Sequence, residues 1–418
     1  MSIKFFQEQY FTCINCGKCC GIWEIPITQS EKERLEKLAV PGIDFSENRF
    51  FEKNKKHKGL YLIGKKDGHC VFLGGDNLCV IHKAHGEKVK PLACRIYPFD
   101  IFNWEDETSS TSLRYDCPGV TSEKGRKINC FGPEINSMAG ELSKKRKLAD
   151  ASYNRKLKPK LSKLRIIASS YKNFLLDTRF RPSIRIFAAA KLIEFHSRPE
   201  NASDIVDAGN FFSKDAMELV KRSIPDLENI ISAAKPLNLH EKMIFRFIIG
   251  SFIRSDEEYA MKFLPFARIS RVKEILKFSL GSGSMGKLSG NLPDISGIDS
   301  IEAVKGMKWD EDALDVYWNY IGSKLESMHF CGSPCLGFTF EEGMRHLVIS
   351  YPVLTSISAL AARADKRGNI TREDVTKALS VIDHTFARSH LFAINYVRKM
   401  TDILCTENAL AAMLKDLP

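Results

Sequence analysis

Apolar residues recur at three- and four-residue intervals through most of the chain beyond residue 160. This spacing places apolar side chains on one face of an α-helix. It predicts helices within residues 161–171, 204–219, 240–253 and 257–278, and over 372–386 after the capping sequence Thr371-Arg372-Glu373-Asp374. The larger part of the chain is therefore expected to be helical.

The first 140 residues show a different pattern. Glycine and proline interrupt them often, and short apolar runs such as 21–27 and 70–73 are typical of β-strands. One helix start is clear, because Thr28 and Glu31 form a capping-box signature ahead of Leu35 and Leu38. We therefore predict a mainly α protein with a small irregular, loop-rich α+β domain at the N-terminus, which binds metal for the reasons given below.

Three segments follow from these patterns. Residues 1–140 form the N-terminal domain, residues 141–192 a basic helical linker, and residues 193–418 a helical domain. A Gly/Ser-rich loop interrupts the last segment at 280–300, and we expect it to be mobile.

Charge is concentrated in the linker. The chain has 418 residues and a net charge of +11, and residues 141–191 contain fifteen Lys or Arg but only three Asp or Glu. An anionic partner such as nucleic acid, phosphate or an acidic protein face could bind there. The alternative is a solvated face of a long helix. The scarcity of aromatic residues among the charges favours this alternative.

The remaining composition is that of an ordinary soluble protein, with 44% hydrophobic and 27% charged residues. No uninterrupted apolar run approaches the roughly 18 residues that a membrane span needs. The first residues lack the apolar core of a signal peptide. We expect a cytoplasmic protein without a membrane span, in which clustered thiols stay reduced and bind metal more readily than they form disulfides.

Four cysteines lie within eight residues near the N-terminus: Cys13, Cys16, Cys19 and Cys20. Gaps of two residues let neighbouring thiolates turn back onto one metal or cluster. The first three also match the start of a bacterial ferredoxin run, from which Cys20 departs. Because adjacent cysteines rarely bind the same metal, Cys20 is a candidate ligand of a second centre.

Further cysteines follow at positions 70, 79, 94 and 117. Together with the first four, Cys70, Cys79, Cys94 and Cys117 could complete two four-sulfur sites; Cys130 is left out of this set. His69, His82 and His85 are spare nitrogen donors, but four thiolates can close a site without them. Arg95, beside Cys94, could donate to a cluster sulfur or pair with a carboxylate.

Thiolates are soft ligands that suit zinc and iron–sulfur clusters. The triple spacing slightly favours an iron–sulfur cluster, and the loop-rich pattern favours neither. In the C-terminal part, Cys331 and Cys335 flank Gly-Ser-Pro. They are candidates for an additional metal or redox site. The alternative is a pair of unrelated core cysteines.

The motif Cys13-Ile14-Asn15-Cys16-Gly17-Lys18-Cys19-Cys20, followed by Gly68-His69-Cys70, Cys79-Val80-Ile81-His82 and Pro91-Leu92-Ala93-Cys94-Arg95-Ile96-Tyr97-Pro98, resembles the YkgJ-like cysteine-cluster family. Its members carry a CxxCxxCC signature and are described as zinc- or iron-chelating. The resemblance covers about residues 10–120. Lys90 stands where the family usually has arginine before the proline.

The resemblance implies a metal-chelating protein that holds iron–sulfur or zinc. The family also includes flagellin lysine N-methylase, which implies an alternative: a protein-lysine methyltransferase that uses S-adenosylmethionine and a protein substrate. A third hypothesis is an interaction protein with structural zinc. The sequence indicates neither catalytic residues nor an oligomeric state.

Overall fold

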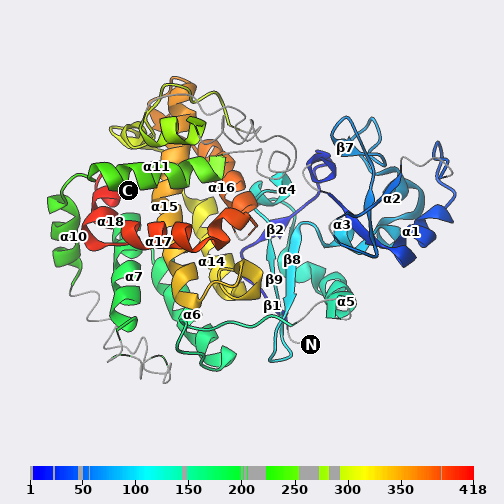
Figure 1. The fold of residues 1–418 in the computed structure, drawn as a ribbon, viewed down its shortest axis with the longest axis horizontal. Coiled ribbons are helices and arrows are strands. Elements are labelled where there is room, and N and C mark those ends of the chain that lie inside the picture. Colours follow the sequence, from blue (N-terminus) through cyan, green and yellow to red (C-terminus); the bar gives the residue numbers. More distant parts are fainter. Residues whose placement is uncertain are drawn as a thin grey trace. The chain divides into compact units, whose positions relative to one another are not determined.

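The fold was obtained as a computed structural model. It describes residues 3–418 except 22–23, 46–49, 56, 144–147, 199–200, 202–204, 206–222, 254–272, 282–291 and 387. The chain divides into two compact units (Figure 1). Unit 1 comprises Met1–Asn103 and Glu107–Leu148, and unit 2 comprises Trp104–Asp106 and Ala149–Pro418.

Unit 1 consists of short strands and short helices joined by turns. Its strands are β1 (Ile3–Lys4), β2 (Tyr10–Phe11), β3 (Pro26–Thr28), β4 (Phe51–Lys53), β5 (Leu60–Ile63), β6 (Lys65–Lys66), β7 (His69–Cys70), β8 (Phe99–Asn103), β9 (Ser109–Leu113) and β10 (Arg126–Lys127). Its helices are η1 (Lys18–Cys20), α1 (Gln29–Glu36), α2 (Val80–His85), η2 (Glu87–Val89), α3 (Leu92–Ile96), α4 (Pro118–Thr121), η3 (Ile128–Phe131) and α5 (Gly132–Ser143).

The strands pair in four small sheets. One has the order β1-β9-β8, with β1 parallel to β9, and another is the antiparallel β3-β5-β4 sheet. The pairs β10-β2 and β6-β7 are antiparallel. Sheets of two or three short strands bury little surface by themselves, so packing between the elements must stabilise unit 1.

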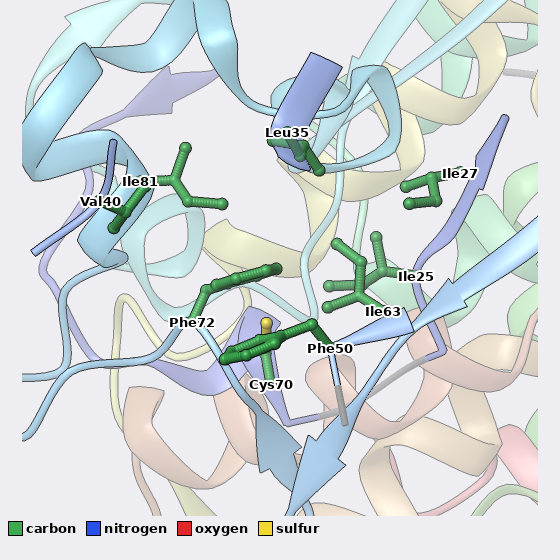
Figure 2. Packing of buried hydrophobic residues seen from close by; sticks show 9 residues of the cluster. All are labelled: Ile25, Ile27, Leu35, Val40, Phe50, Ile63, Cys70, Phe72 and Ile81. Atoms are coloured by element: carbon green, nitrogen blue, oxygen red, sulfur yellow. The ribbon is translucent and has the colours of Figure 1, made fainter. Parts of the chain in front are cut away.

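A compact apolar core joins β3, α1, β5, β7 and α2. It consists of nine buried residues: Ile25, Ile27, Leu35, Val40, Phe50, Ile63, Cys70, Phe72 and Ile81. The rings of Phe50 and Phe72 stack with centroids 5.6 Å apart, and Figure 2 shows the Cys70 side chain beside them. A cysteine of the predicted metal set therefore belongs to the hydrophobic core itself.

Unit 2 is mainly helical. Its helices are α6 (Leu161–Leu175), α7 (Pro182–His196), α10 (Ile224–Ala233), α11 (Leu239–Ile253), η5 (Glu302–Val304), α14 (Asp315–Ser327), η6 (Ser333–Cys335), α15 (Phe340–Ala364), α16 (Arg372–Thr385), η7 (His390–Ala393), α17 (Asn395–Leu404) and α18 (Glu407–Leu414). Two short strands, β11 (Lys308–Trp309) and β12 (Asn369–Ile370), pair in parallel.

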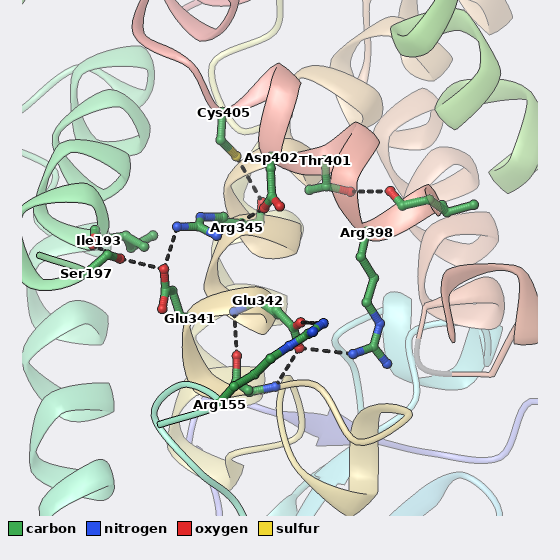
Figure 3. A network of polar contacts seen from close by, with 12 residues as sticks. Arg155, Ile193, Ser197, Glu341, Glu342, Arg345, Arg398, Thr401, Asp402 and Cys405 are labelled. Atoms are coloured by element: carbon green, nitrogen blue, oxygen red, sulfur yellow. Dashed lines mark hydrogen bonds and ion pairs between the residues drawn. The ribbon is translucent and has the colours of Figure 1, made fainter. Parts of the chain in front are cut away.

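Helix α15 is the central element of unit 2, and it packs against α7, α11, α16 and α17 (Figure 1). By length and composition alone this helix could cross a membrane, but 89% of its most apolar stretch is buried inside the structure. At its first turn Glu341 and Glu342 bond with Arg345 and Arg398, and this polar network (Figure 3) connects α15 to α17.

The predicted fold class is confirmed: the chain is mainly helical, with small sheets confined mostly to its N-terminal part. The capping boxes at Thr28 and Thr371 form as predicted and begin α1 and α16. The helices predicted within 161–171 and 240–253 correspond to α6 and α11. The helix predicted over 204–219, most of that over 257–278 and much of the loop at 280–300 lie outside the described residues.

Candidate metal centre

The CxxCxxCC segment leaves β2 as an extended loop and turns into η1. Asn15 and Gly17 adopt left-handed backbone conformations, with φ of 56° and 65°. A Cβ on Gly17 would lie 3.3 Å from the side-chain oxygen of Asn77, so both the turn and its close packing favour glycine. Cys13 and Cys16 are exposed on this loop, whereas Cys19 and Cys20 in η1 are partly buried.

Four thiols come together on the apolar core of unit 1. Cys20, Cys79 and Cys94 pack against the cluster that contains Cys70. Cys20 lies in η1, Cys79 is the N-cap of α2, Cys94 lies in α3 and Cys70 ends β7. We call Cys20, Cys70, Cys79 and Cys94 the inner thiols.

Cys70 and Cys94 interact electrostatically with the neighbouring thiols. Burial raises the pKa of Cys70 to about 11, and negative charge on Cys79 raises it further. Burial likewise raises the pKa of Cys94, with contributions from Cys70 and Cys79. Negative charge on neighbouring thiols thus disfavours ionisation of Cys70 and Cys94, and a bound cation would remove this repulsion.

The adjacent pair in η1 shares one hydrogen bond. The Cys20 thiol donates to Cys19, which lowers the pKa of Cys19 and raises that of Cys20. Charge on Cys19 also raises the pKa of both Cys94 and Tyr97. Cys19 therefore interacts electrostatically both with Cys94 and with Tyr97, which hydrogen-bonds to Cys117.

Cys117 lies at the N-cap of α4, where backbone and side-chain groups donate hydrogen bonds to its sulfur. Burial raises its pKa to about 11, while the backbone N–H groups of Gly119 and Val120 and the Tyr97 hydroxyl donate to it and oppose the rise. Its neighbour Asp116 is buried and accepts hydrogen bonds from Arg114 at 3.1 Å and from the Tyr97 hydroxyl at 3.3 Å.

Two glycines hold the strand before Cys13 against α4 and β10. A Cβ on Gly119 would lie only 2.2 Å from the carbonyl oxygen of Thr12, and one on Gly125 would lie 2.5 Å from that of Phe11. Real Cβ atoms do not approach other atoms this closely, so the chain can pack this way only because both positions are glycine. They place the start of the CxxCxxCC loop beside the helix that Cys117 begins. We call Cys13, Cys16, Cys19 and Cys117 the outer thiols.

Lys18 adds a positive charge to this region. Burial lowers its pKa, whereas negative charge on Asp116, Cys16 and Cys117 raises it. A lysine held among thiols can offset the negative charge of a thiolate cluster. Sequence reasoning missed Lys18, Tyr97 and Asp116; their only signal is that each lies within three residues of a candidate cysteine.

The donor set fits a soft metal by its chemistry, since all eight predicted ligands are thiols. Within the described part of the chain, no group of three or more His, Cys, Asp or Glu side chains has the geometry to hold a metal ion. The structure thus brings the thiols together without closing a coordination shell, and the predicted ligand set stays a prediction.

Arg95, His69 and His85, which lie near the candidate cysteines in the sequence, contact groups other than thiols. Arg95 binds Glu141 through both guanidinium nitrogens, at 3.0 and 2.6 Å, so of the two predicted roles it takes carboxylate pairing. The Nε2 atom of His85 lies 2.8 Å from the Ala39 carbonyl oxygen. The His69 ring lies against Gly21, where a Cβ would be 3.1 Å from Nδ1.

The second predicted cysteine pair belongs to unit 2. Cys331 and Cys335 flank the turn into η6 and have no exposed surface. Burial raises the pKa of Cys335 to about 12 and that of Cys331 well above its usual value. Both thiols are therefore neutral at physiological pH, and their metal or redox role stays a prediction.

The described part of the basic segment uses several of its charges within unit 2. Its ion pairs include Arg155–Glu342, Lys158–Asp150, Arg165–Asp106 and Lys172–Glu326. Arg185 is buried and stacks 3.8 Å over the Trp318 ring. An anionic partner at this segment also stays a prediction.

The family model CxxCxxCC, "Putative zinc- or iron-chelating domain", matches residues 12–118. These residues form a CxxCxxCC domain. The match begins one residue before Cys13 and ends one residue after Cys117, so the domain contains both the inner and the outer thiols.

Known relatives align with about a quarter of the chain. An uncharacterized protein of Methanocaldococcus jannaschii is 29% identical over 121 residues, or 28% of this chain and 40% of that protein. The lysine-N-methylase of Salmonella choleraesuis is 26% identical over 119 residues, or 27% of this chain and 29% of the methylase. The flagellar biosynthetic protein FliU of Salmonella muenchen is 29% identical over 119 residues, or 27% of this chain and 70% of FliU. No solved structure matches the chain.

Proposed function

We propose that the CxxCxxCC domain chelates zinc or iron at two centres, one held by the inner thiols and one by the outer thiols. The observation that supports this proposal is that Cys20, Cys79 and Cys94 pack against the core cluster that contains Cys70. Four thiols from four separate elements converge there, which is the ligand number of a closed structural site.

The outer centre rests on different contacts. The approach of Thr12 to Gly119 brings the CxxCxxCC loop to Cys117, and Lys18 interacts with both Cys16 and Cys117. Cys19 belongs to this centre by its spacing from Cys13 and Cys16, while Cys20 belongs to the inner one. Division of the adjacent cysteines between two centres avoids crowding on one metal.

Elemental analysis of protein purified without air tests the proposal. The variants Cys94→Ser and Cys117→Ser should each lose part of the metal, and the double variant should lose nearly all of it. Cys130→Ser is the matched control, because Cys130 is exposed and lies outside both groups. Complete loss of metal from either single variant would show one shared centre.

The same samples identify the metal. Visible absorbance and brown colour would indicate iron–sulfur, and colourless protein with bound zinc would indicate zinc. A domain that folds and contains neither element would refute chelation. A zinc protein without catalysis would fit the hypothesis of an interaction protein with structural zinc.

A second candidate function is supported by similarity to two Salmonella proteins that are named lysine-N-methylase. In this hypothesis the chain transfers a methyl group from S-adenosylmethionine to lysines of a protein substrate. Radiolabelled methyl transfer to flagellin by the metal-loaded chain tests it, with the double cysteine variant as control. No transfer above that control would contradict the hypothesis.

A further inference from the structure

Unit 2 contains a cavity remote in sequence from the cysteine motif. Its volume is about 280 Å³, near the lower end of the roughly 300–1,000 Å³ of small-ligand sites. Helices α11, α15 and α18, together with η5 and the connection between α10 and α11, form its walls. The apolar lining includes Leu237, Phe245, Val304, Met413 and Leu417.

Ser356 of α15 lines this cavity and is only 3% exposed. The neighbouring hydroxyls bond back to their own helix: Thr355 donates to the Pro352 carbonyl at 3.0 Å and Ser358 to the Leu354 carbonyl at 2.9 Å. Among the described residues, the Ser356 hydroxyl has no such partner. A cavity-lining hydroxyl that is not bonded to its own helix can donate to or accept from a bound ligand.

The charged residues of the cavity indicate whether that ligand is an anion or a cation. Glu302 forms an ion pair with Lys305 at 2.7 Å, and the Lys415 ammonium donates to the Ala234 carbonyl at 3.3 Å. The Lys242 ammonium has no hydrogen-bond or ion-pair partner in the described part of the chain. It is thus available to an anion.

The number of charges limits the anion. Among the described residues, three lysines and the carboxylates of Glu302 and Asp416 line the cavity, which leaves one positive charge in excess. The two carboxylates would repel a dianion such as phosphate, whereas a single negative charge is balanced. Aromatic and thioether side chains, Phe245 and Met413, suit an apolar ligand body.

We propose that this cavity binds a small monocarboxylate with an apolar aryl or alkyl body. The carboxylate accepts hydrogen bonds from Lys242 and Ser356, and the body contacts Phe245 and Met413. The proposal is independent of the metal chemistry of unit 1, because the described lining residues all belong to unit 2 and include no cysteine.

Isothermal titration of the full chain with 3-phenylpropionate tests it, with 3-phenylpropanamide as the uncharged analogue. The carboxylate should bind at least about tenfold more tightly than the amide, since hydrogen bonds to charged groups are the stronger ones. Lys242→Gln and Ser356→Ala should each weaken carboxylate binding about tenfold. Ser356→Leu, which fills the cavity, should abolish it.

Two matched variants control for general effects. Ser358→Ala removes a hydroxyl of the same helix that bonds internally, and Lys308→Gln removes an exposed ammonium outside the cavity. Both should bind like the parent chain, with circular dichroism to verify folding. Equal affinity for carboxylate and amide, tighter binding of inorganic phosphate, equal weakening in the controls, or no binding of the carboxylate would overturn the proposal.

Discussion

The contact between Gly119 and Thr12 gives the sharpest prediction for the CxxCxxCC domain. In Gly119→Ala the new Cβ would lie 2.2 Å from the Thr12 carbonyl oxygen, where ordinary contacts begin at 3.4 Å. The backbone before Cys13 must therefore move by about 1 Å, and overpacking of this kind costs roughly 1–3 kcal/mol. Because the displaced strand leads into the outer thiols, metal binding there should weaken by about 5- to 150-fold.

Gly140→Ala is the matched control, since Gly140 also lies in a helix of unit 1 but a Cβ there meets nothing within 4 Å. It should keep its metal and gain about 0.5–1 kcal/mol of stability from the better helix former. Transfer of metal to a chromophoric chelator, followed in both variants and the parent chain, measures the difference. Equal transfer from Gly119→Ala and Gly140→Ala would refute the reasoning that this contact positions the outer thiols.

Three other substitutions test packing and buried charge. Phe50→Ala should destabilise unit 1 by about 3–5 kcal/mol in denaturant unfolding, because it removes a fully buried ring from the core. Lys324→Met should destabilise unit 2 by about 3–5 kcal/mol, because the Lys324 ammonium lies 2.7 Å from the buried Asp383 carboxylate and its removal leaves that charge unpaired. The double variant with Asp383→Leu should recover most of that loss. Burial, aided by the charge of Arg398, lowers the pKa of His346 to about 3. As the pH falls, the unfolded chain therefore binds a proton at His346 before the folded chain does. The free energy of unfolding should fall by about 1.4 kcal/mol per pH unit below pH 6.5. Thermal melts at a series of pH values should show this slope in the parent chain and not in His346→Phe.

Local signals in the sequence predicted the elements that local interactions form. The capping boxes at Thr28 and Thr371 need only residues three positions apart, and both appear in the structure. Helical periodicity identified α6 and α11 for the same reason, because their buried faces repeat within a few residues. The mainly helical class follows from such short-range patterns.

The arrangement of the thiols depends on contacts that no short pattern contains. Cys20 and Cys94 pack against the same core as Cys70 because β3, α1 and β5 build that core. The approach of Thr12 to Gly119 spans more than a hundred residues, and it appears in the sequence only as one glycine among many. The spacing therefore predicted which cysteines to consider, while their division into inner and outer thiols required the fold.

The inner thiols are more buried than Cys13 and Cys16 of the outer thiols, and this difference affects how fast each proposed centre would exchange metal with the surroundings. Cys13 and Cys16 are open to solvent, whereas Cys94 and Cys70 lie within the packed unit. If the two proposed centres form, a metal on the exposed pair would be handed over to small chelators or partner thiols while the fold stays intact. A metal on the buried thiols would leave only when the core opens. One domain would then combine a slowly exchanging store with a rapidly exchanging site, and the unfolding rate of the core would determine how long the store lasts.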